Sequence, residues 1–550
     1  MSAPAIVSSF STIDAAIAVL SLVVTLWIGL RVKRHIGSIE DYLVASRGMG
    51  LYVGAASLLS TEVGIITYMY QAQFGFVAGF SAFVTGLITL AVCLWVGRTG
   101  FVITRLREMR ILTVPEYFER RYGRSVRVLA GMLMAFGGSL NLGIFPIIEA
   151  RFLAIVTGIP SRYLAWTMAT LLVIALAYTA LGGMVSLIVT NYVQFVFLAA
   201  GTIVVTLACL RHVSWGQMVS SVESHLDGKG FDPIADFGVG FILWQVLLWV
   251  ALMTVWQSVA MRTFSTKDAD VGKRMFTLTG FLFLGRAVIP MVWGIAALGF
   301  FWGRGEPRLP RETATAQQVE ARLGESFRRD LDEGRLGHAL ADVDLLERLA
   351  REENAGDPRA ARLEESVRER RGEIGLVSMP WMLAAVLPTG LLGLVVAGML
   401  AASISTYAGY FLGWSSIIAQ DIVAPLAGKE LSDSARLTLT RTTIVGLTLF
   451  IMIWGLVYDL PGPAYFYLQV TANLFMAPTL IAVVGGLYWR RASAAGAALS
   501  FVLGALTSLG YLVPGLKLDV ATAGNLSWGL AVAGFVVGSL LVPSRLELRS

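Results

Sequence analysis

Long apolar segments recur along almost the whole chain, separated by short polar stretches. Each segment is long enough to cross about 30 Å of hydrocarbon as an α-helix. Ten-residue segments of alternating polarity, typical of membrane β-barrels, do not recur in the sequence. The pattern predicts an all-α membrane protein with about thirteen transmembrane helices. The predicted spans are 10–31, 51–71, 76–97, 127–156, 161–182, 185–210, 238–260, 276–301, 390–422, 437–457, 463–488, 492–514 and 525–543.

The composition agrees with this pattern. Of the 550 residues, 56% are hydrophobic and only 15% are charged, and the mean hydropathy is +0.70, which soluble domains of this size do not reach. The first span is long and has no basic residue in front of it, so we expect it to be retained rather than cleaved as a signal peptide. Cys93 and Cys209 lie in apolar segments, and we expect neither a disulfide framework nor a metal cluster.

Basic residues gather in the loops of one side, if every predicted segment crosses the membrane. The positive-inside rule assigns that side to the cytoplasm, so we expect a multi-pass cell-membrane protein with its N-terminus outside and its C-terminus inside. The net charge of +6 therefore indicates membrane orientation and not a nucleic-acid surface. The basic residues are Arg31, Lys33, Arg34, Arg105, Arg107, Arg110, Arg120, Arg121, Arg124, Arg127, Lys267, Lys273, Arg274, Arg490, Arg491, Arg545 and Arg549.

One charged segment, residues 303–375, interrupts the apolar pattern and separates a membrane part at 1–302 from another at 376–550. Its apolar residues recur at helical spacing between proline and glycine breaks, which predicts a small helical insert on the extracytoplasmic side. Two interpretations stay open: a hydrated helical loop, or a surface that docks a partner protein or covers the entrance to the membrane part. The apolar residues at this spacing are Leu336, Leu340, Val343, Leu346 and Leu349.

Polar residues interrupt the second span at its middle. Ser60, Thr61, Glu62 and Gly64 lie halfway along this span, where a glycine eases unwinding and freed backbone groups need polar partners. The sequence therefore predicts a discontinuous helix, as found at the midplane sites of transporters. A carboxylate at this depth costs at least about 2.5–3.5 kcal/mol, so Glu62 is expected to face a cavity or a partner.

Three hydroxyl residues lie together in the middle of another span, in "SISTYAGYF" (403–411). Ser403, Ser405 and Thr406 are compatible with a close helix-packing face, because serine and threonine often bond to their own helix and let helices approach. They are also compatible with a cation site, because neutral oxygen atoms from a broken helix and from hydroxyl groups suit a hard cation. The residue types alone leave both interpretations open.

Other charged residues also lie inside predicted spans. Arg286 is in mid-span and needs an anion, unwound carbonyl groups or a water-filled path; the anion could be a substrate carboxylate or Glu62. Glu149 and Arg151 lie in the outer half of the fourth span, two residues apart and so on nearly opposite helix sides. They fit either side chains that reach the outer surface or the walls of a substrate vestibule.

Six segments resemble, in the same order, the sodium:solute symporter family, which includes sodium–proline, sodium–galactose and sodium–sialic acid transporters. The resemblance runs from about Asp41 to about Ala497 and is interrupted by the insert. The segments are "EDYLVASRGMG" (40–50), "TVPEYFERRYG" (113–123), "YTALGGMVSLIVTNYVQ" (178–194), "QSVAMR" (257–262), "SISTYAGYFLGWSSIIAQDI" (403–422) and "APTLIAVVGGLYWRRASAAGA" (477–497).

The resemblance implies a fold of two inverted five-helix repeats, with a discontinuous first core helix, one leading helix and two trailing helices. The core helices one to seven fall in 1–302 and eight to ten in 376–550. The resemblance also implies a sodium ion between the first and eighth core helices. The sodium ligands would be the carbonyl groups of Ser60, Val63 and Ala402 and the hydroxyl groups of Ser405 and Thr406. The expected substrate-binding residues are Glu62, Thr67, Trp249, Gln257, Arg286 and Gln469.

Two departures from the family pattern affect the expected substrates. Relatives proposed to bind a second sodium carry an aspartate where this chain has Asn191, so we expect no second sodium at that position. The third span has no acidic residue where sugar carriers present one to hydroxyl groups. With Glu62 and Arg286 both available, a zwitterionic or carboxylate-bearing solute fits better than a sugar.

These observations predict a sodium-coupled symporter that imports a small polar organic solute. Its expected partners are the solute, sodium and the lipid bilayer, with a possible protein partner at the insert and no nucleic acid. Two alternatives are a proton-coupled symporter of the same fold and a transporter-like solute sensor that acts with a partner. We expect no enzyme, because the sequence contains no histidine cluster, nucleophile elbow or phosphate loop.

Overall fold

The protein is described by a computed structural model over residues 6–32, 38–226, 228–311, 313–352, 358–427, 431–460, 462–512 and 519–543. Within these ranges the chain is mainly helical, and its one β-type pairing is an isolated parallel bridge between Met49 and Thr266. Outside them lie four of the basic residues that predict the orientation, namely Lys33, Arg34, Arg545 and Arg549.

The α-helices differ widely in length, and several adjoining ones continue each other across a short break or bend. A π-helical segment, η5 (Ile417–Val423), continues α18. The α-helices are α1 (Thr12–Val32), α2 (Ile39–Val44), α3 (Leu51–Glu62), α4 (Ile65–Ala78), α5 (Phe83–Thr99), α6 (Ile103–Glu108), α7 (Val114–Tyr122), α8 (Arg124–Gly143), α9 (Phe145–Thr157), α10 (Leu164–His212), α11 (Trp215–His225), α12 (Pro233–Val255), α13 (Gln257–Ser265), α14 (Ala269–Phe301), α15 (Ala316–Asp332), α16 (Leu336–Glu352), α17 (Pro358–Val386), α18 (Leu391–Ser416), α19 (Ala424–Leu426), α20 (Asp433–Val457), α21 (Ala464–Tyr488), α22 (Ala494–Leu512) and α23 (Val520–Leu541).

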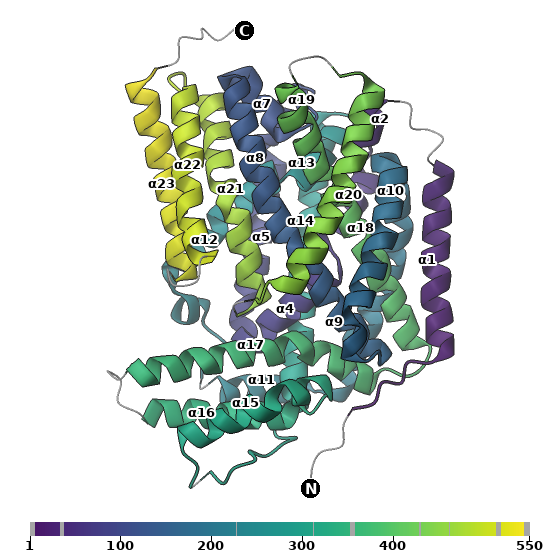
Figure 1. Ribbon diagram of the computed structural model, residues 1–550, viewed down its shortest axis with the longest axis vertical. Helices are drawn as coiled ribbons and strands as arrows, with labels where there is room; N and C mark the ends of the chain where they lie inside the picture. The colour runs from purple at the N-terminus through teal and green to yellow at the C-terminus, as the bar shows by residue number, and fades with distance from the viewer. Residues whose placement is uncertain are drawn as a thin grey trace.

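The long helices form a bundle whose axes run in roughly the same direction (Figure 1). Among the described residues, eleven helical stretches are long and apolar enough to cross a membrane, and Ala494–Gly510 is a shorter apolar helix. The predicted total of about thirteen spans is not reproduced by this count. One reason is that α4 and α5 follow each other so closely that they form one apolar stretch, Ile65–Thr99. Large apolar side chains such as Trp27, Trp166 and Leu456 are exposed on the bundle, as expected of a surface that contacts lipid.

Apart from α10, which turns at Gly183 with φ 53° and ψ −162°, two of the helical rods described are broken. The predicted break in the second span is confirmed, because α3 ends at Glu62 and α4 begins at Ile65. A second break separates α12 from α13 at Trp256, whose φ of −63° and ψ of 120° are extended. This second break was not predicted, since the sequence around Trp256 contains neither glycine nor proline.

Helix α18 lies at the centre of the bundle, and almost every residue of it is buried. It packs along α10 and also contacts α3 and α13, so it borders both broken rods. Beside it, α4 crosses α14 at very close range. A Cβ atom on Gly75 would lie 2.2 Å from the carbonyl oxygen of Met291, and one on Gly294 would lie 1.8 Å from that of Ala72. Glycine at both positions lets the two backbones touch.

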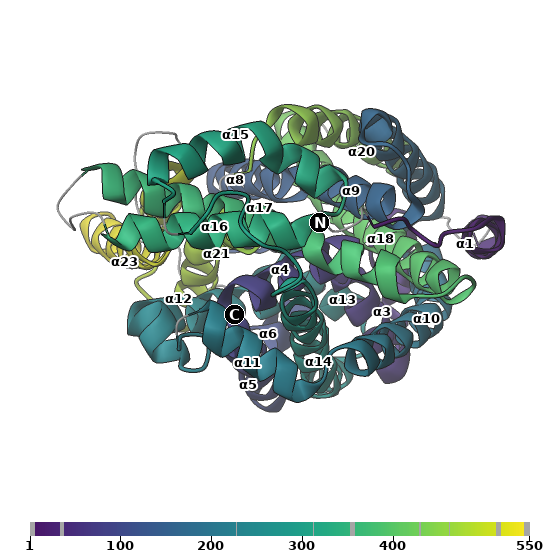
Figure 2. The ribbon, with the colours of Figure 1, turned by 90° about the horizontal axis from the view of Figure 1, so that it is seen from below.

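The charged insert is folded, and it lies across one end of the bundle (Figure 1). It is built from α15, α16 and the first half of α17, which pack on one another, and α17 also packs on α4, α9 and α14. Figure 2 views this end directly and shows the three helices lying across the bundle. The predicted apolar face is largely buried, and α17 continues past residue 375 to Val386 without a break. The insert therefore joins the membrane part through a continuous helix.

Candidate functional site

The break between α3 and α4 is a short extended segment inside the bundle. Val63 has φ −125° and ψ 102°, and Gly64 has φ −120° and ψ −179°, so neither continues the helix. The hydroxyl group of Thr67 donates to the carbonyl oxygen of Glu62 across the break at 3.2 Å. Because carbonyl groups at the end of α3 lose their helical partners, the break exposes oxygen atoms to other ligands.

The first amide groups of α4 are bound by side chains from two other helices. The N–H of Ile65 donates to Ser403 Oγ at 3.1 Å, and the N–H of Ile66 donates to Glu149 Oε1 at 3.3 Å. Ser403 belongs to α18 and Glu149 to α9, and both side chains are fully buried. The start of α4 is thus held by a hydroxyl group on one side and a carboxylate on the other.

The two hydroxyl groups predicted as cation ligands on α18 make different contacts. Thr406 Oγ1 donates to the carbonyl oxygen of Ala402 at 3.1 Å, and a Cβ atom on Gly64 would lie only 2.9 Å from Thr406 Oγ1. Ser405 Oγ donates to Asn191 Oδ1 at 2.6 Å. Thr406 therefore lies against the break, whereas Ser405 is linked to α3 through Asn191 of α10.

Asn191 links three helices beside these hydroxyl groups. Besides accepting from Ser405, its amide nitrogen donates to Ser57 Oγ and Thr61 Oγ1, each at 3.2 Å. Its backbone carbonyl accepts from Ser60 Oγ at 3.1 Å. The side chain is buried. A neutral amide therefore joins α3, α10 and α18 where the family pattern led us to look for a carboxylate.

Arg262 is a buried cation next to the break that the sequence analysis did not assign to the site. Its Nη2 donates to Thr61 Oγ1 at 2.7 Å, and its Nη1 donates to the carbonyl oxygen of Ser258 at 2.9 Å. Glu62 is the acidic group that interacts with it electrostatically. The depth of Arg262 depends on the break before α13, which the sequence did not predict. The one available sequence signal was therefore the position of Arg262 at the end of a segment that resembles the family.

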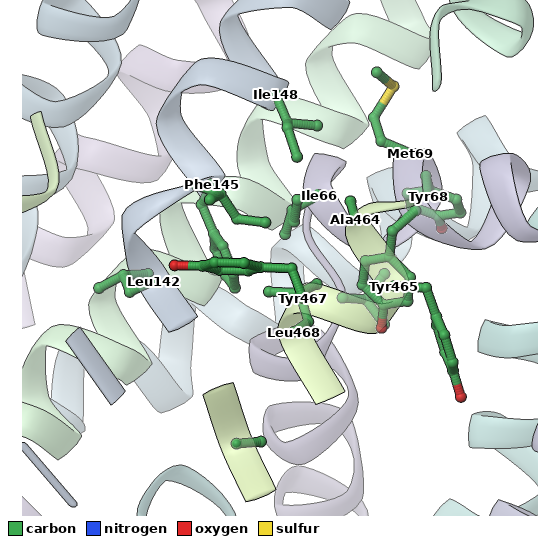
Figure 3. Packing of buried hydrophobic residues seen from close by; sticks show 14 of the residues in the cluster. Ile66, Tyr68, Met69, Leu142, Phe145, Ile148, Ala464, Tyr465, Tyr467 and Leu468 are labelled. Carbon is green, nitrogen blue, oxygen red and sulfur yellow. The ribbon is translucent and has the colours of Figure 1, made fainter. Parts of the chain in front are cut away.

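A cavity of about 70 Å³ borders both the break and α18. Figure 3 shows three of its apolar lining residues, Ile66, Phe145 and Leu468, converging from α4, α9 and α21. This volume is well below the roughly 300–1,000 Å³ of typical ligand sites, so a solute needs side chains to move apart. The lining consists of Glu62, Ile66, Thr67, Tyr70, Asn141, Phe145, Trp249, Leu252, Met253, Trp256, Val259, Phe283, Arg286, Thr406, Tyr410, Leu468, Gln469 and Ala472.

The charged groups of the cavity are held by specific partners. Tyr410 donates its hydroxyl group to Glu62 Oε2 at 2.9 Å, while Glu62 Oε1 is buried without a hydrogen bond of ordinary geometry. Arg286 Nε donates to the backbone oxygen of Glu62 at 2.7 Å, and its Nη2 donates to Tyr70 at 3.0 Å. The structure thus supports unwound carbonyl groups as partners of Arg286, one of the expected alternatives. Gln469 Oε1 is also buried without a partner.

Five of the six expected substrate residues line this cavity, and the sixth does not. Gln257 accepts from the N–H of Val114 at 3.1 Å and donates to Ser416 Oγ at 3.4 Å, so it ties α13 to α7 and α18. It is outside the cavity lining. The residues in the lining are Glu62, Thr67, Trp249, Arg286 and Gln469.

Glu149 reaches neither the outer surface nor a vestibule wall, the two positions that its place in the fourth span suggested. It is fully buried against the break, because α9 packs on α4 and its carboxylate replaces a helical acceptor for Ile66. Arg151 faces a different hollow, which it shares with Arg328 and Asp332 of the insert. Their spacing on the helix correctly predicted that the two side chains point apart.

A network of charges closes the end of the bundle opposite the insert. Asp421, which is fully buried in the π-helical segment, accepts from Arg127 Nε at 2.7 Å and from Thr113 Oγ1 at 2.9 Å. Arg127 also pairs with Glu119. These contacts tie α18 to α8 and to the start of α7. Movement of the end of α18 and η5 away from α7 and α8 would have to break the buried ion pair between Asp421 and Arg127.

Comparisons with known proteins agree with one another. A family model described as the sodium:solute symporter family matches residues 42–319 and 370–504. The chain is 22% identical over 497 residues to a sodium/glucose cotransporter of Vibrio parahaemolyticus, covering 87% of this chain and 80% of the relative. It is 25% identical over 504 residues to a sodium/mannose cotransporter of Bos taurus, covering 87% and 74%.

A solved structure extends the comparison to the fold. The substrate-bound, outward-open structure of a sodium-coupled sialic acid symporter matches with a TM-score of 0.73 at 16% identity, covering 98% of this chain and 100% of that chain. At this identity the likeness concerns the fold alone. It confirms the expected architecture, in which α3 and α4 form the discontinuous first core helix of two inverted repeats.

Proposed function

The chain belongs to the sodium:solute symporter family, and on that basis we propose that it imports a small polar organic solute together with sodium across the cell membrane. The family and the matched relatives are membrane transporters and not enzymes. Sodium-coupled movement of a solute through a multi-pass protein follows from that membership. The residues that bind sodium and solute, the class of solute and the orientation in the membrane are proposals.

In this proposal the sodium ion lies between the end of α3 and α18. Its ligands are the backbone oxygens of Ser60, Val63 and Ala402 and the hydroxyl groups of Ser405 and Thr406. Support comes from the extended Val63 and from the position of Thr406 against the break. Uncharged oxygen ligands of this kind suit sodium at the membrane midplane.

The solute is proposed to occupy the cavity and to carry a carboxylate or to be a zwitterion. Glu62 Oε1 and Gln469 Oε1 are buried acceptors without partners, so they can bind an ammonium or hydroxyl group of the solute. Arg286 uses Nε and Nη2 for protein contacts, which leaves Nη1 for an anionic group. Thr67 and Trp249 complete the proposed contacts. Gln257 stays a predicted contact, since the cavity lining does not include it.

One observation carries the coupling: the same broken helix borders both sites. Thr406, a proposed sodium ligand, also lines the cavity, and Thr67 both lines the cavity and bonds across the break. Sodium bound here therefore fixes the helix that forms the solute site. Joint occupancy would favour closure on one side of the membrane and opening on the other. The membrane potential adds about 2.3 kcal/mol per charge per 100 mV.

The proposed orientation places the insert outside the cell and the opposite end in the cytoplasm. Helix α1 begins near the insert, whereas α7 and the end of α23 lie at the other end of the bundle (Figure 1). The basic segment around α7 is on the latter side. This arrangement agrees with the positive-inside rule.

Proton coupling in place of sodium is a second candidate, because Glu62 and Glu149 are carboxyl groups buried at the break. A thermal-shift screen of the purified protein against amino acids, small carboxylates and sugars, with and without sodium, identifies the solute class. Uptake of the selected solute into proteoliposomes then separates the candidates. Uptake driven by a sodium gradient supports the proposal, whereas uptake that ignores sodium and follows a pH gradient supports proton coupling. A screen in which only sugars stabilise the protein would overturn the proposed solute class.

A further inference from the structure

Glu149 is a carboxyl group inside the membrane part without an ion-pair partner. Its side chain has no exposed surface, and no lysine, arginine or histidine among the described residues forms a salt bridge with it. Arg151, two residues away, lines a separate hollow. A carboxylate buried in this way is very costly unless a positive charge neutralises it.

The atoms around Glu149 are suited to receive such a charge. Oε1 accepts from the N–H of Ile66 at 3.3 Å, while Oε2 is buried without a hydrogen bond of ordinary geometry. Ser403 and Tyr407 of α18 both interact with the carboxyl group. The hydroxyl group of Tyr407 is likewise buried without a partner of ordinary geometry. The carboxyl group of Glu149 therefore has a phenol oxygen and a serine oxygen beside it.

The site has other ligands than the sodium site proposed above, but both adjoin Gly64. Oε1 of Glu149 would lie 3.4 Å from a Cβ atom on Gly64, whereas Thr406 Oγ1 would lie 2.9 Å from that atom. Glu149 of α9 and Thr406 of α18 therefore both approach Gly64. The Glu149 site also differs from the region around Asn191, because Asn191 is on α10 and bonds to Ser405.

We propose that Glu149, with Ser403 and Tyr407, forms a second site for a monovalent cation, and that occupancy of this site sets the start of α4. The cation is a sodium ion or a proton. A sodium ion would be held by Glu149 Oε2 and the two hydroxyl oxygens. A proton taken from solvent would form an O–H bond at Oε2, and the bond would break when the proton returns to solvent.

This inference rests on the proposed function for its role in transport, but its test does not. The variant is Glu149→Gln in the full-length protein, since glutamine still offers an oxygen to Ile66 and has no charge. The matched control is Glu116→Gln, at the partly exposed pair with Arg120. Tyr407→Phe is a second variant, which removes one proposed ligand and leaves the carboxyl group.

Equilibrium binding of radioactive sodium to purified protein tests the sodium form. If the second cation is sodium, the wild type and Glu116→Gln bind about one sodium ion more per protein than Glu149→Gln. Tyr407→Phe then lowers the affinity for that ion. Infrared spectroscopy tests the proton form without any transport assay. If the second cation is a proton, the carbonyl band of a buried carboxylic acid is present in the wild type and lost in Glu149→Gln.

The proposal is overturned if Glu149→Gln folds, binds as many sodium ions as the wild type and shows the same carboxylic acid band. If Glu149→Gln does not fold, Tyr407→Phe decides: weaker binding of one sodium ion or a shifted carboxylic acid band supports the proposal, and unchanged sodium binding with an unchanged band overturns it. Failure of sodium-driven uptake in the wild type would contradict the proposed function alone. Both cation measurements could still succeed in that case.

Discussion

Asn191 and Ser405 are joined by a buried hydrogen bond of 2.6 Å that connects α10 to α18 beside the broken helix. The bond uses the oxygen of an amide, while the amide nitrogen is committed to Ser57 and Thr61 on α3. Three helices therefore depend on one neutral side chain. Its neutrality bears on how many ions this region can hold.

Replacing Asn191 with aspartate should make the protein depend on sodium for its stability. Aspartate loses the two donated hydrogen bonds and places a buried carboxylate beside hydroxyl groups, with Arg262 reaching it only through Thr61, at a cost of about 3–5 kcal/mol. A bound sodium ion would offset much of that cost. The melting temperature of Asn191→Asp should be low without sodium and should rise with sodium more than that of the wild type. The control, Asn191→Ala, should be destabilised without gaining this response.

Removal of the hydroxyl groups of Ser405 and Thr406 together should weaken sodium activation. Each lost ligand removes about 1–3 kcal/mol, so the sodium concentration for half-maximal uptake should rise at least tenfold. Ser415→Ala is a matched control on the same helix, because the hydroxyl group of Ser415 donates within α18, to the carbonyl oxygen of Leu412. Unchanged sodium activation in the double variant, measured in proteoliposomes, would place the ion elsewhere.

Arg286→Gln separates the two roles of this residue. If Nη1 binds the solute, affinity for carboxylate-bearing solutes should fall by about 10- to 100-fold relative to uncharged analogues, because a charge-assisted bond is lost. Ligand affinities measured by thermal shift or calorimetry give this ratio. An equal loss for charged and uncharged ligands would show that Arg286 acts only by holding the carbonyl group of Glu62 and the hydroxyl group of Tyr70.

Asp421→Asn should weaken the closed end of the bundle. Arg127 would keep Glu119 but lose its buried partner, at a cost of about 3–5 kcal/mol, which should lower the melting temperature. Exchange of backbone amide hydrogens in α7 and η5 should become faster. The double variant Arg127→Gln/Asp421→Asn removes both charges and should recover part of the stability, whereas simple additivity would contradict a direct coupling.

The first break and the second break differ in how far the sequence revealed them. Four polar or small residues around Glu62 interrupt an apolar run, and this pattern was enough to predict that the helix unwinds. At Trp256 the residue that leaves the helix is a large aromatic within an apolar run, so hydropathy gave no signal. Arg262 was missed for the same reason, since its depth follows from that break.

The case of Glu149 shows another limit of sequence patterns. Helical spacing correctly separated it from Arg151, but spacing does not say which neighbouring helix each side chain meets. Its role depends on α9 meeting the first turn of α4, a contact between residues 83 positions apart. The site residues inferred from the resemblance remain predictions, although most of those expected to bind solute line one cavity.

The continuous α17 gives the insert a mechanical connection to the centre of the protein. This helix starts in the insert and packs on α4, the second half of the broken rod, and on α9, whose Glu149 binds the start of α4. An antibody fragment bound to the exposed face of the insert would therefore restrict the movement of α4, and the restriction would be measured as a lower turnover rate. The same fragment would add a rigid marker for imaging the protein in successive states of its transport cycle.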